Sequence, residues 1–340
     1  MKTGKISDNV LKRTILKSIG KNPAGCVKPS AGKDAAYLTS VSENTDVFVM
    51  GMSTVVGENV GDILKAIFVS SNNVLAAGCV PQAIVLNITL PEATEEAELR
   101  RYMEAAYETA KSMNMGIIGG HTEVSEYVTK PVFSVICSSG LSHGKMKTKE
   151  KNKAYDIVMT GYAGYEGAAE IFNMCEDEYA KIFTAEYLKD VRDALFRLSI
   201  EKEAAVAIQH GVTAMHDIHT CGVFGALWEL GEQIKSGFTI DIRKIPVKQS
   251  TIEVCERVEV NPYELSSVGA LLMVTEDGEG LVEKLRAQNL QAEIIGNVSD
   301  NNERVLLNKG EKRFLDKPGI DELYRIKKLK EDSQLCVRKF

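Results

Sequence analysis

Apolar and polar residues alternate in blocks along this chain, and the period within each block predicts a strand or a helix. Short runs rich in β-branched and apolar side chains predict strands at residues 47–52, 82–90, 115–120 and 131–141. A helical spacing of apolar residues predicts helices at 8–19, 59–77 and 94–114. In the clearest of these helices Thr94 is the candidate N-cap, and acidic residues fill the first turn.

The same alternation returns in the second half of the chain. It predicts strands at residues 156–162, 238–242, 266–275, 292–298 and 304–308. It predicts helices at residues 164–175, 222–234, 248–258 and 280–289. Residues 211–221 are expected to form a loop that leads into the helix at 222–234.

One stretch interrupts the alternation and marks a domain boundary. Residues 142–155, SHGKMKTKEKNKAY, are basic and poor in apolar side chains, which is typical of a solvated linker. We therefore predict an N-terminal domain at 1–145 and a second domain at 153–310, with a polar C-terminal tail at 311–340. Strands and helices that alternate in two blocks are typical of tandem α/β domains.

Composition and charge narrow the class of protein. The net charge of −6 argues against a general nucleic-acid binder, which needs a basic face, but it still allows a nucleotide ligand. The start of the chain has no secretory apolar region, and the longest apolar runs are too short to span a bilayer, so we expect no membrane association. Seven cysteines without a CxxC pair favour reduced thiols and a cytoplasmic location.

Residues 117–123 read IIGGHTE and form the first candidate site. We expect a buried strand to run into a turn at Gly119 and Gly120, whose amides can cradle a phosphate. His121 and Thr122 would then project from the strand end, where α/β proteins place ligands. The alternative is a plain turn with a surface histidine, because short glycine motifs are common.

Two carboxylates adjoin other glycine-containing turns. Asp34 in AGKDAAYL (31–38) enters a strand, where it can hold Mg²⁺ for a nucleotide or serve only as a turn residue. Glu166 in GYAGYEGAAEIF (161–172) opens a helix whose first amides suit an anion, with Gly167 beside it. Glu166 can be a base, a metal ligand, or a favourable charge at the positive helix end.

Residues 214–222, AMHDIHTCG, place His216, Asp217, His219 and Cys221 within six positions. A structural zinc site needs four converging ligands, often as two pairs, and this stretch has no second pair. His216 and Asp217 point to opposite sides if the segment is extended, so the four side chains do not converge. Spacing alone therefore disfavours zinc here.

The order of these segments resembles the AIR synthase-related superfamily, also called PurM-like. The resemblance covers about residues 1–310 and rests on GKDAA, NNVLAAGCVP, IIGGHTE, DIVMTGYAGYEGAAEI, AMHDIHTCGVFGAL and NPYELSSVGALLMV. The last two segments are most similar to the branch of the hydrogenase-maturation carbamoyl dehydratase, HypE. The resemblance implies an α/β (α+β) fold of two domains. It also implies a homodimer in which two N-terminal domains close an intersubunit β-barrel.

The resemblance further implies a site for ATP and Mg²⁺. It assigns the metal to Asp34, Asn73 and Asp217. It assigns nucleotide contacts to Lys33, Asp34, Asn73, Gly119, Gly120, Thr122 and Gly167. It makes His121, Glu166 and Asp217 the candidates for catalysis.

The chain also departs from the family pattern. Lys33 replaces one aspartate of the usual pair, and Asn73 stands where relatives carry a carboxylate, although Mg²⁺ prefers hard oxygen ligands. Cys336 lies near the end but is not the last residue, unlike the terminal cysteine of the dehydratase, so we expect it to be a bystander.

Three functions remain open from the sequence. The first is ATP-dependent activation of an amide or acyl oxygen by phosphorylation and dehydration, with a protein partner in a maturation pathway. The second is a catalytically attenuated, nucleotide-binding regulatory or scaffold dimer. The third is a ligase similar to aminoimidazole ribonucleotide synthetase.

Overall fold

The computed structural model describes residues 7–19, 27–39, 47–139, 146–150 and 153–332. Cys336 lies outside these residues. The chain divides into two compact units: an N-terminal unit of residues 21–29 and 34–145, and a C-terminal unit of residues 1–20, 30–33 and 146–340. In the described residues, no helix combines the length and the apolar character that crossing a membrane requires.

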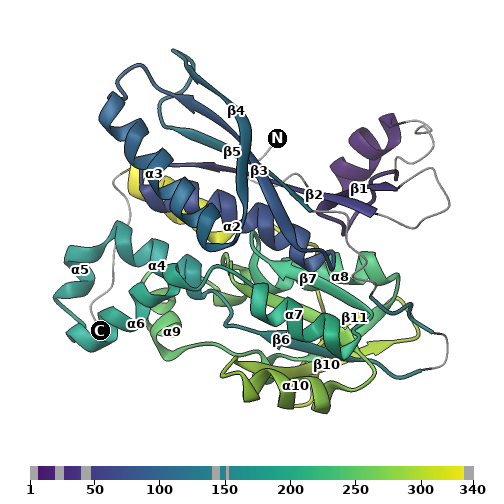
Figure 1. Cartoon of the computed structure of the whole chain (residues 1–340). Helices are drawn as coiled ribbons and strands as arrows, with labels where there is room; N and C mark the ends of the chain where they lie inside the picture. The colour runs from purple at the N-terminus through teal and green to yellow at the C-terminus, as the bar shows by residue number, and fades with distance from the viewer. Residues whose placement is uncertain (1–6, 20–26, 40–46, 140–145, 151–152, 333–340) are drawn as a thin grey trace. The chain divides into compact units, whose positions relative to one another are not determined.

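The N-terminal unit is a five-stranded sheet with two helices packed on one face (Figure 1). The spatial order is β1-β2-β5-β3-β4; β3 and β4 are parallel, and the other neighbouring pairs are antiparallel. The strands are β1 (Ala35–Thr39), β2 (Val47–Val56), β3 (Pro81–Leu90), β4 (Gly116–Val124) and β5 (Val132–Ser139). The helices are α2 (Val60–Ala76) and α3 (Glu96–Ser112).

Alternate side chains of this sheet point toward the helices and form the core of the unit. Phe133 of β5 meets Tyr102 of α3 edge to face, with ring centroids 5.0 Å apart. The side chains that alternate with the core positions remain 38% to 58% exposed at Leu38, Met52, Val56 and Ile136. Within this unit, the sheet therefore presents an apolar face that its own helices do not cover.

The C-terminal unit contains a seven-stranded mixed sheet in the order β12-β11-β8-β10-β6-β9-β7. The strands are β6 (Asp156–Thr160), β7 (Ala214–Ile218), β8 (Gly237–Asp241), β9 (Ala270–Thr275), β10 (Ala292–Ser299), β11 (Arg304–Asn308) and β12 (Glu311–Phe314). The helices are α1 (Asp8–Val10), α4 (Tyr165–Met174), α5 (Glu176–Ala180), α6 (Ala185–Asp193), α7 (Glu201–His210), α8 (Gly222–Ile234), α9 (Gln249–Arg257), α10 (Gly278–Ala287) and α11 (Glu322–Glu331). Short helical turns are η1 (Leu11–Leu16), η2 (Ala194–Phe196), η3 (Ile242–Lys244) and η4 (Pro262–Glu264).

Two apolar clusters hold the C-terminal unit together. One lies between the sheet and α8, where Leu227 and Leu230 are completely buried. The other joins α4, α9 and α11, and Ile326 of α11 is completely buried in it. Residues 7–19 also belong to this unit, where the Lys12 ammonium lies 2.5 Å from the Glu232 carboxylate of α8.

The α/β fold class predicted from the sequence is confirmed, and most elements lie where the pattern placed them. The helix at 222–234 has the predicted bounds. The helix predicted from Thr94 begins later, at Glu96, because the Glu95 N–H donates to the Glu98 carboxylate at 3.0 Å and makes Glu95 the N-cap.

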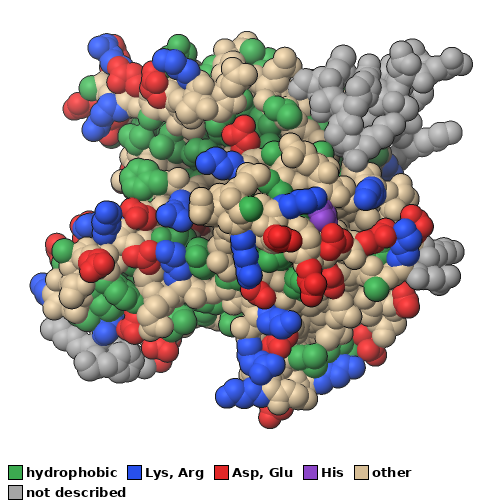
Figure 2. All heavy atoms as spheres, turned by 60° about the horizontal axis from the view of Figure 1, so that its bottom comes forward, with side chains coloured by type: hydrophobic (Ala, Val, Ile, Leu, Met, Phe, Trp, Pro, Cys, Tyr) green, Lys and Arg blue, Asp and Glu red, His purple; other side chains and the backbone are tan. Residues whose placement is uncertain are grey.

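On the face drawn in Figure 2, basic and acidic side chains are intermixed.

Candidate functional site

The segment AMHDIHTCG is a strand followed by a tight turn, so the loop predicted at 211–221 is wrong at residues 214–218 and holds on either side of them. Residues 214–218 form β7, which pairs with β9 and is buried at every position. Backbone hydrogen bonds to β9 and burial beneath α8 outweigh the polar character of His216 and Asp217. Asp217 is 3% exposed.

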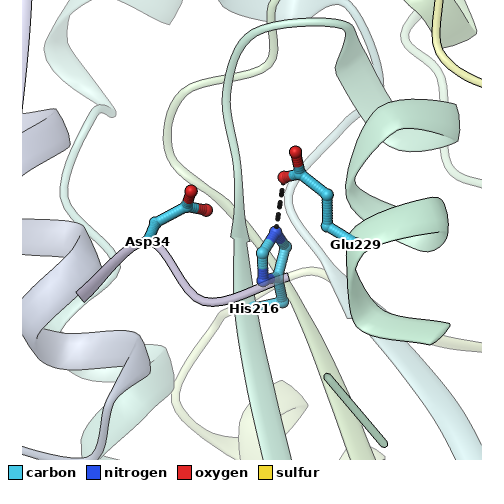
Figure 3. A group of neighbouring side chains, drawn as sticks. All are labelled: Asp34, His216 and Glu229. Carbon is cyan, nitrogen blue, oxygen red and sulfur yellow. Dashed lines mark hydrogen bonds and ion pairs between the residues drawn. The ribbon is translucent and has the colours of Figure 1, made fainter. Parts of the chain in front are cut away.

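His216 and Glu229 form a buried pair between β7 and α8. The histidine Nε2 lies 3.1 Å from the Glu229 carboxylate, and the two side chains are 5% and 20% exposed (Figure 3). The other polar residues of the stretch have different surroundings. His219 Nδ1 accepts the Thr220 N–H at 2.7 Å, and the Cys221 thiol lies 3.6 Å from the Gly319 carbonyl oxygen.

Two glycine-containing helix starts pack against one short segment, and we call this arrangement the helix-start junction. It comprises residues 161–167 at the start of α4, residues 219–222 at the start of α8, and residues 263–268. A Cβ at Gly222 would lie 2.6 Å from the carbonyl oxygens of Tyr263 and Leu265. A Cβ at Gly167 would lie 2.6 Å from Leu265 Cγ. Both helices therefore need glycine to approach this segment.

Ser267 ties the two helix starts together. Its hydroxyl oxygen accepts the Gly164 N–H at 2.7 Å, and its own N–H donates to the His219 carbonyl at 3.3 Å. The strand predicted at 266–275 accordingly begins only at Ala270, because the residues before it serve the junction. Sequence reasoning recorded NPYELSSVGALLMV as a family mark and gave no role to its serines.

Glu166 is buried within the junction, at the N-terminus of α4. It is 1% exposed, and its Oε2 accepts a hydrogen bond from the Ser266 hydroxyl at 2.7 Å. The Val268 N–H lies 3.5 Å from the same oxygen. A carboxylate held in this way is stabilised by the positive end of the helix and anchors α4 to the 263–268 segment.

A second buried carboxylate lies at the start of α8 and comes from the far end of the chain. Asp321 is 2% exposed and accepts the Cys221 N–H at 2.6 Å. Its other oxygen accepts the Leu323 N–H at 2.8 Å and caps α11. Sequence reasoning missed Asp321. The available signal was an aspartate placed before the apolar residues Leu323 and Ile326 at helical spacing.

A lysine lies beside the glycine turn of the junction. The Lys248 ammonium stands 5.2 Å and 4.8 Å from the ring centroids of Tyr162 and Tyr165, and it pairs with Asp190. Burial opposes ionisation of Asp190, but hydrogen bonds from Lys248 and Ser250 outweigh it and hold the pKa of Asp190 below its usual value. This cluster is an ion pair that lies beside Tyr162 and Tyr165.

The glycines of IIGGHTE lie inside a strand, so the prediction of a buried strand ending in a glycine turn is wrong. β4 continues to Val124 at the edge of its sheet, and Gly119, Gly120, His121 and Thr122 are all exposed. Gly120 is required by packing, since a Cβ there would lie 2.0 Å from the Leu86 carbonyl oxygen of β3. A register shift beside it adds one residue to β4.

The remaining predicted residues lie in both units. Asn73 of α2 is 4% exposed, and its amide nitrogen donates to the Met52 carbonyl of β2 at 3.4 Å. Asp34 immediately precedes β1 of the N-terminal unit and is partly buried. Lys33 belongs to the C-terminal unit and is exposed. Gly32 beside it packs on the Glu229 backbone of α8 with φ at 77°.

Comparison with protein families gives two consecutive matches. Residues 29–139 match the N-terminal domain of AIR synthase related proteins, and residues 157–308 match the C-terminal domain. A putative hydrogenase expression/formation protein of Methanocaldococcus jannaschii is 25% identical over 334 residues, which cover 95% of this chain and 97% of the relative. The carbamoyl dehydratase HypE of Rhizobium leguminosarum bv. viciae is 25% identical over 76% of this chain and 73% of its own length.

Solved structures show the same fold. The chain aligns with HypE from a HypE–HypF complex with a TM-score of 0.72 and 18% identity, over 91% of this chain and 99% of that one. It aligns with HypE in complex with ATP with a TM-score of 0.65 and 15% identity, over 94% and 97% of the two chains. With both domain models matched in order and a relative aligned along nearly its whole length, this chain belongs to the AIR synthase-related family and has the PurM-like two-domain fold.

Proposed function

We propose that this protein binds ATP with Mg²⁺ and is an ATP-dependent enzyme of the HypE-like branch. Its reaction would phosphorylate an amide or acyl oxygen and then eliminate the phosphate. Relatives that carry the name carbamoyl dehydratase align over most of the chain, and a HypE structure with ATP shares its fold. We also propose a protein partner, because a HypE structure of the same fold was solved in complex with HypF.

The observation that carries the proposal is the helix-start junction. Two helix N-termini start against the same six-residue segment, so the positive ends of two helix dipoles act on one region. Backbone amides at helix starts are common phosphate ligands. The Lys248–Asp190 ion pair lies beside the start of α4. This arrangement supports a nucleotide ligand through helix-start amides other than those of Gly164 and Cys221, which Ser267 and Asp321 already bind.

The residues assigned to the nucleotide have different surroundings, and we divide their roles accordingly. Asp34 and Asp217 offer carboxylate oxygens, and Asn73 offers an amide oxygen while its nitrogen holds β2. These are the hard donors that Mg²⁺ prefers, so each is a candidate ligand of the proposed magnesium ion. We assign phosphate contacts to Lys33 and to residues 119–122. When bound, the metal would neutralise charge on the phosphates.

Glu166 and Gly167 have structural roles in this proposal. The Glu166 carboxylate accepts a hydrogen bond from Ser266 and is 1% exposed. This favours a role in anchoring α4 over a role in proton transfer. His121 is well exposed and remains the candidate for acid–base work, with Glu123 at 3.6 Å. Its ring can exchange protons with solvent and with a bound substrate.

The test is calorimetric titration with ATP, with and without Mg²⁺, together with an assay of phosphate release. Asp217→Asn keeps the size of the buried side chain and is expected to weaken Mg²⁺-dependent ATP binding at least tenfold. Asp300→Asn, an exposed aspartate of the same unit, is the matched control and is expected to bind like wild type. Wild-type protein that gives no binding heat in either condition would sink the proposal.

A second candidate is a nucleotide-binding scaffold without turnover, and the loss of acidic residues favours it. Lys33 and Asn73 replace carboxylates, which lowers the negative charge available to hold metals. ATP titration and the phosphate-release assay together distinguish the enzyme from the scaffold. Mg²⁺-dependent binding of ATP supports the scaffold if no phosphate is released with any of the amide or carbamoyl acceptors tested.

We also propose a homodimer formed through the uncovered face of the N-terminal sheet. Met52, Val56 and Ile136 leave apolar surface exposed on that face, and such patches mark association sites. Met52→Glu is expected to convert the dimer to a monomer in sedimentation measurements, because it buries a charge in the interface. Phe196→Glu, which changes an 87% exposed residue of the other unit, should leave the dimer intact. A monomeric wild-type protein contradicts this assignment.

A further inference from the structure

The C-terminal segment, residues 315–331, is an integral part of its unit. Leu315 is buried in the cluster with α8, and Leu323 and Ile326 are buried in the cluster with α4 and α9. Lys327 of α11 lies 2.8 Å from the Glu170 carboxylate of α4. Arg325 donates to the Glu259 carbonyl at 2.7 Å. The segment therefore covers both apolar clusters and ends beside α4.

Asp321 is the charged residue through which this segment contacts the helix-start junction, beside the contact between the Cys221 thiol and the Gly319 carbonyl oxygen. Its carboxylate accepts the N–H of Cys221, the residue before α8, and the N–H of Leu323 in the first turn of α11. Cys221 has a φ of 67°, a left-handed conformation that is unfavourable for a residue with a side chain. A charge-assisted hydrogen bond from a buried carboxylate offsets that cost and fixes the turn at 219–222.

The turn that Asp321 fixes belongs to the proposed nucleotide site. It follows Asp217 directly, and its His219 carbonyl accepts the Ser267 N–H. We propose that Asp321 is a positioning residue: the docked C-terminal segment holds the 219–222 turn in its ligand-competent conformation, so that docking of α11 and ATP affinity are coupled. The coupling to ATP rests on the proposed function, whereas the docking itself does not.

Three buried thiols lie along this segment and report its docking without any ligand. Cys221 Sγ is 3.6 Å from the Gly319 carbonyl oxygen, and Cys175 and Cys255 lie in the same cluster as Leu323 and Ile326. Each of the three cysteines is at most 6% exposed. Burial raises the pKa of Cys255 to about 12, so this thiol is protonated at neutral pH and reacts only when the segment opens.

The first experiment measures alkylation rates of these thiols by peptide mass spectrometry. Asp321→Ala is expected to raise the rates at Cys175, Cys221 and Cys255 at least tenfold, and Asp321→Asn should give a smaller rise. Cys137, fully buried in the N-terminal unit, is the internal control and should not change. Asp316→Ala, an exposed aspartate of the same segment, is the matched control variant and should react like wild type. Unchanged rates in Asp321→Ala overturn the proposal.

Chemical rescue separates the carboxylate from a general loss of stability. Sodium formate at tens of millimolar can occupy the space left in Asp321→Ala and accept the same two N–H groups. It is expected to restore slow alkylation, whereas sodium chloride at the same concentration should not. Equal effects of the two salts overturn the assignment of Asp321 as the positioning group.

Two measurements test the coupling between docking of α11 and ATP binding: the effect of Asp321→Ala on ATP affinity, and the effect of ATP on thiol reactivity. Asp321→Ala is expected to weaken ATP binding at least tenfold in calorimetry, with Asp316→Ala unchanged. Since coupling is reciprocal, saturating Mg²⁺–ATP should slow alkylation of Cys175 and Cys255 in the wild-type protein. Fast alkylation combined with unchanged ATP affinity overturns the coupling and leaves the proposed function standing. A wild-type protein that binds no ATP overturns the proposed function and the coupling, while the thiol rates alone decide the docking role.

Discussion

The strands β4 and β7 each form one edge of a sheet, and each carries a histidine close to a glutamate. On β4, His121 and Glu123 lie 3.6 Å apart with side chains 68% and 54% exposed. On β7, His216 and Glu229 of α8 lie 3.1 Å apart with side chains 5% and 20% exposed. The same two residue types therefore stand at equivalent topological places in opposite environments.

The difference between the pairs follows from what covers each edge. α8 packs against β7 and removes its histidine from water, so that solvent cannot replace the contact with Glu229 if it is lost. Within the N-terminal unit, β4 is exposed at His121 and Glu123, and solvent screens their interaction. Breaking a buried pair costs stability, whereas an exposed pair is accessible to a ligand. Sequence motifs alone do not distinguish the two cases.

Breaking the buried pair should have the largest effect. His216→Ala is expected to lower the free energy of unfolding of the C-terminal unit by about 3 kcal/mol, because the Glu229 carboxylate loses its histidine partner inside the protein. The single tryptophan, Trp228, lies on α8 and reports this unfolding by fluorescence in urea. Glu229→Gln and the double variant complete a thermodynamic cycle. Strictly additive losses would contradict direct coupling of the pair.

The two glycines of β4 give the next effect and a matched control. Gly120→Ala is expected to destabilise β4 by about 2 kcal/mol, since its Cβ would lie 2.0 Å from the Leu86 carbonyl oxygen and the strands must separate. Gly119→Ala meets no atom within 4 Å and should change stability by less than about 0.5 kcal/mol. Hydrogen exchange of the β3 and β4 amides measures both variants. Equal protection in the two would contradict a packing role for Gly120.

The cluster of Asp190 with Lys248 and Ser250 predicts how stability depends on pH. Its pKa is lowered in the folded protein, so Asp190 contributes stability above its unfolded pKa of about 3.9 and loses that contribution as pH falls through the folded value. Asp190→Asn should therefore cost less than about 1 kcal/mol at pH 7, since the carboxylate is 39% exposed and screened, and less still near pH 3. Urea unfolding at both pH values tests this. A loss of stability in Asp190→Asn that grows as the pH falls would contradict the lowered pKa of Asp190.

Removing the exposed histidine should have the smallest effect on stability. His121→Ala is expected to change the free energy of unfolding by less than about 0.5 kcal/mol, because its pair with Glu123 is exposed. Thermal unfolding at low and high salt measures this. Any loss of phosphate release in this variant then reflects chemistry rather than folding, and a loss of stability above about 1 kcal/mol would contradict the comparison.

The sequence predicted those features that depend on local pattern. α8 has its predicted bounds because its apolar face is continuous and a glycine stands at its start. The loop prediction at residues 214–218 is wrong because adjacent polar residues such as His216 and Asp217 are typical of turns. The buried partner of His216, Glu229, cannot be identified from the local pattern. Gly119 and Gly120 suggested a turn, but Gly120 serves a close approach to β3, which is a contact between strands.

The candidate site was predicted less completely, because its decisive contacts span long distances in the chain. Ser267 joins α4 to the turn before α8, and Asp321 reaches Cys221 from 100 positions away. Neither contact leaves a periodic signal. The segments that form the helix-start junction were nevertheless all marked by family resemblance. What remained hidden was that they pack on one another and which side chains tie them.

The helical residues 8–16 have a consequence for the order of events during synthesis. Lys12 of this segment pairs with Glu232, 220 positions later, so this contact cannot form while the N-terminal unit emerges from the ribosome. At roughly 5–20 residues per second, this wait lasts on the order of 10–40 seconds. The intervening sheet can complete its own pairing during that time. The segment that contains Lys12 is thus made before the N-terminal sheet and makes this contact after it.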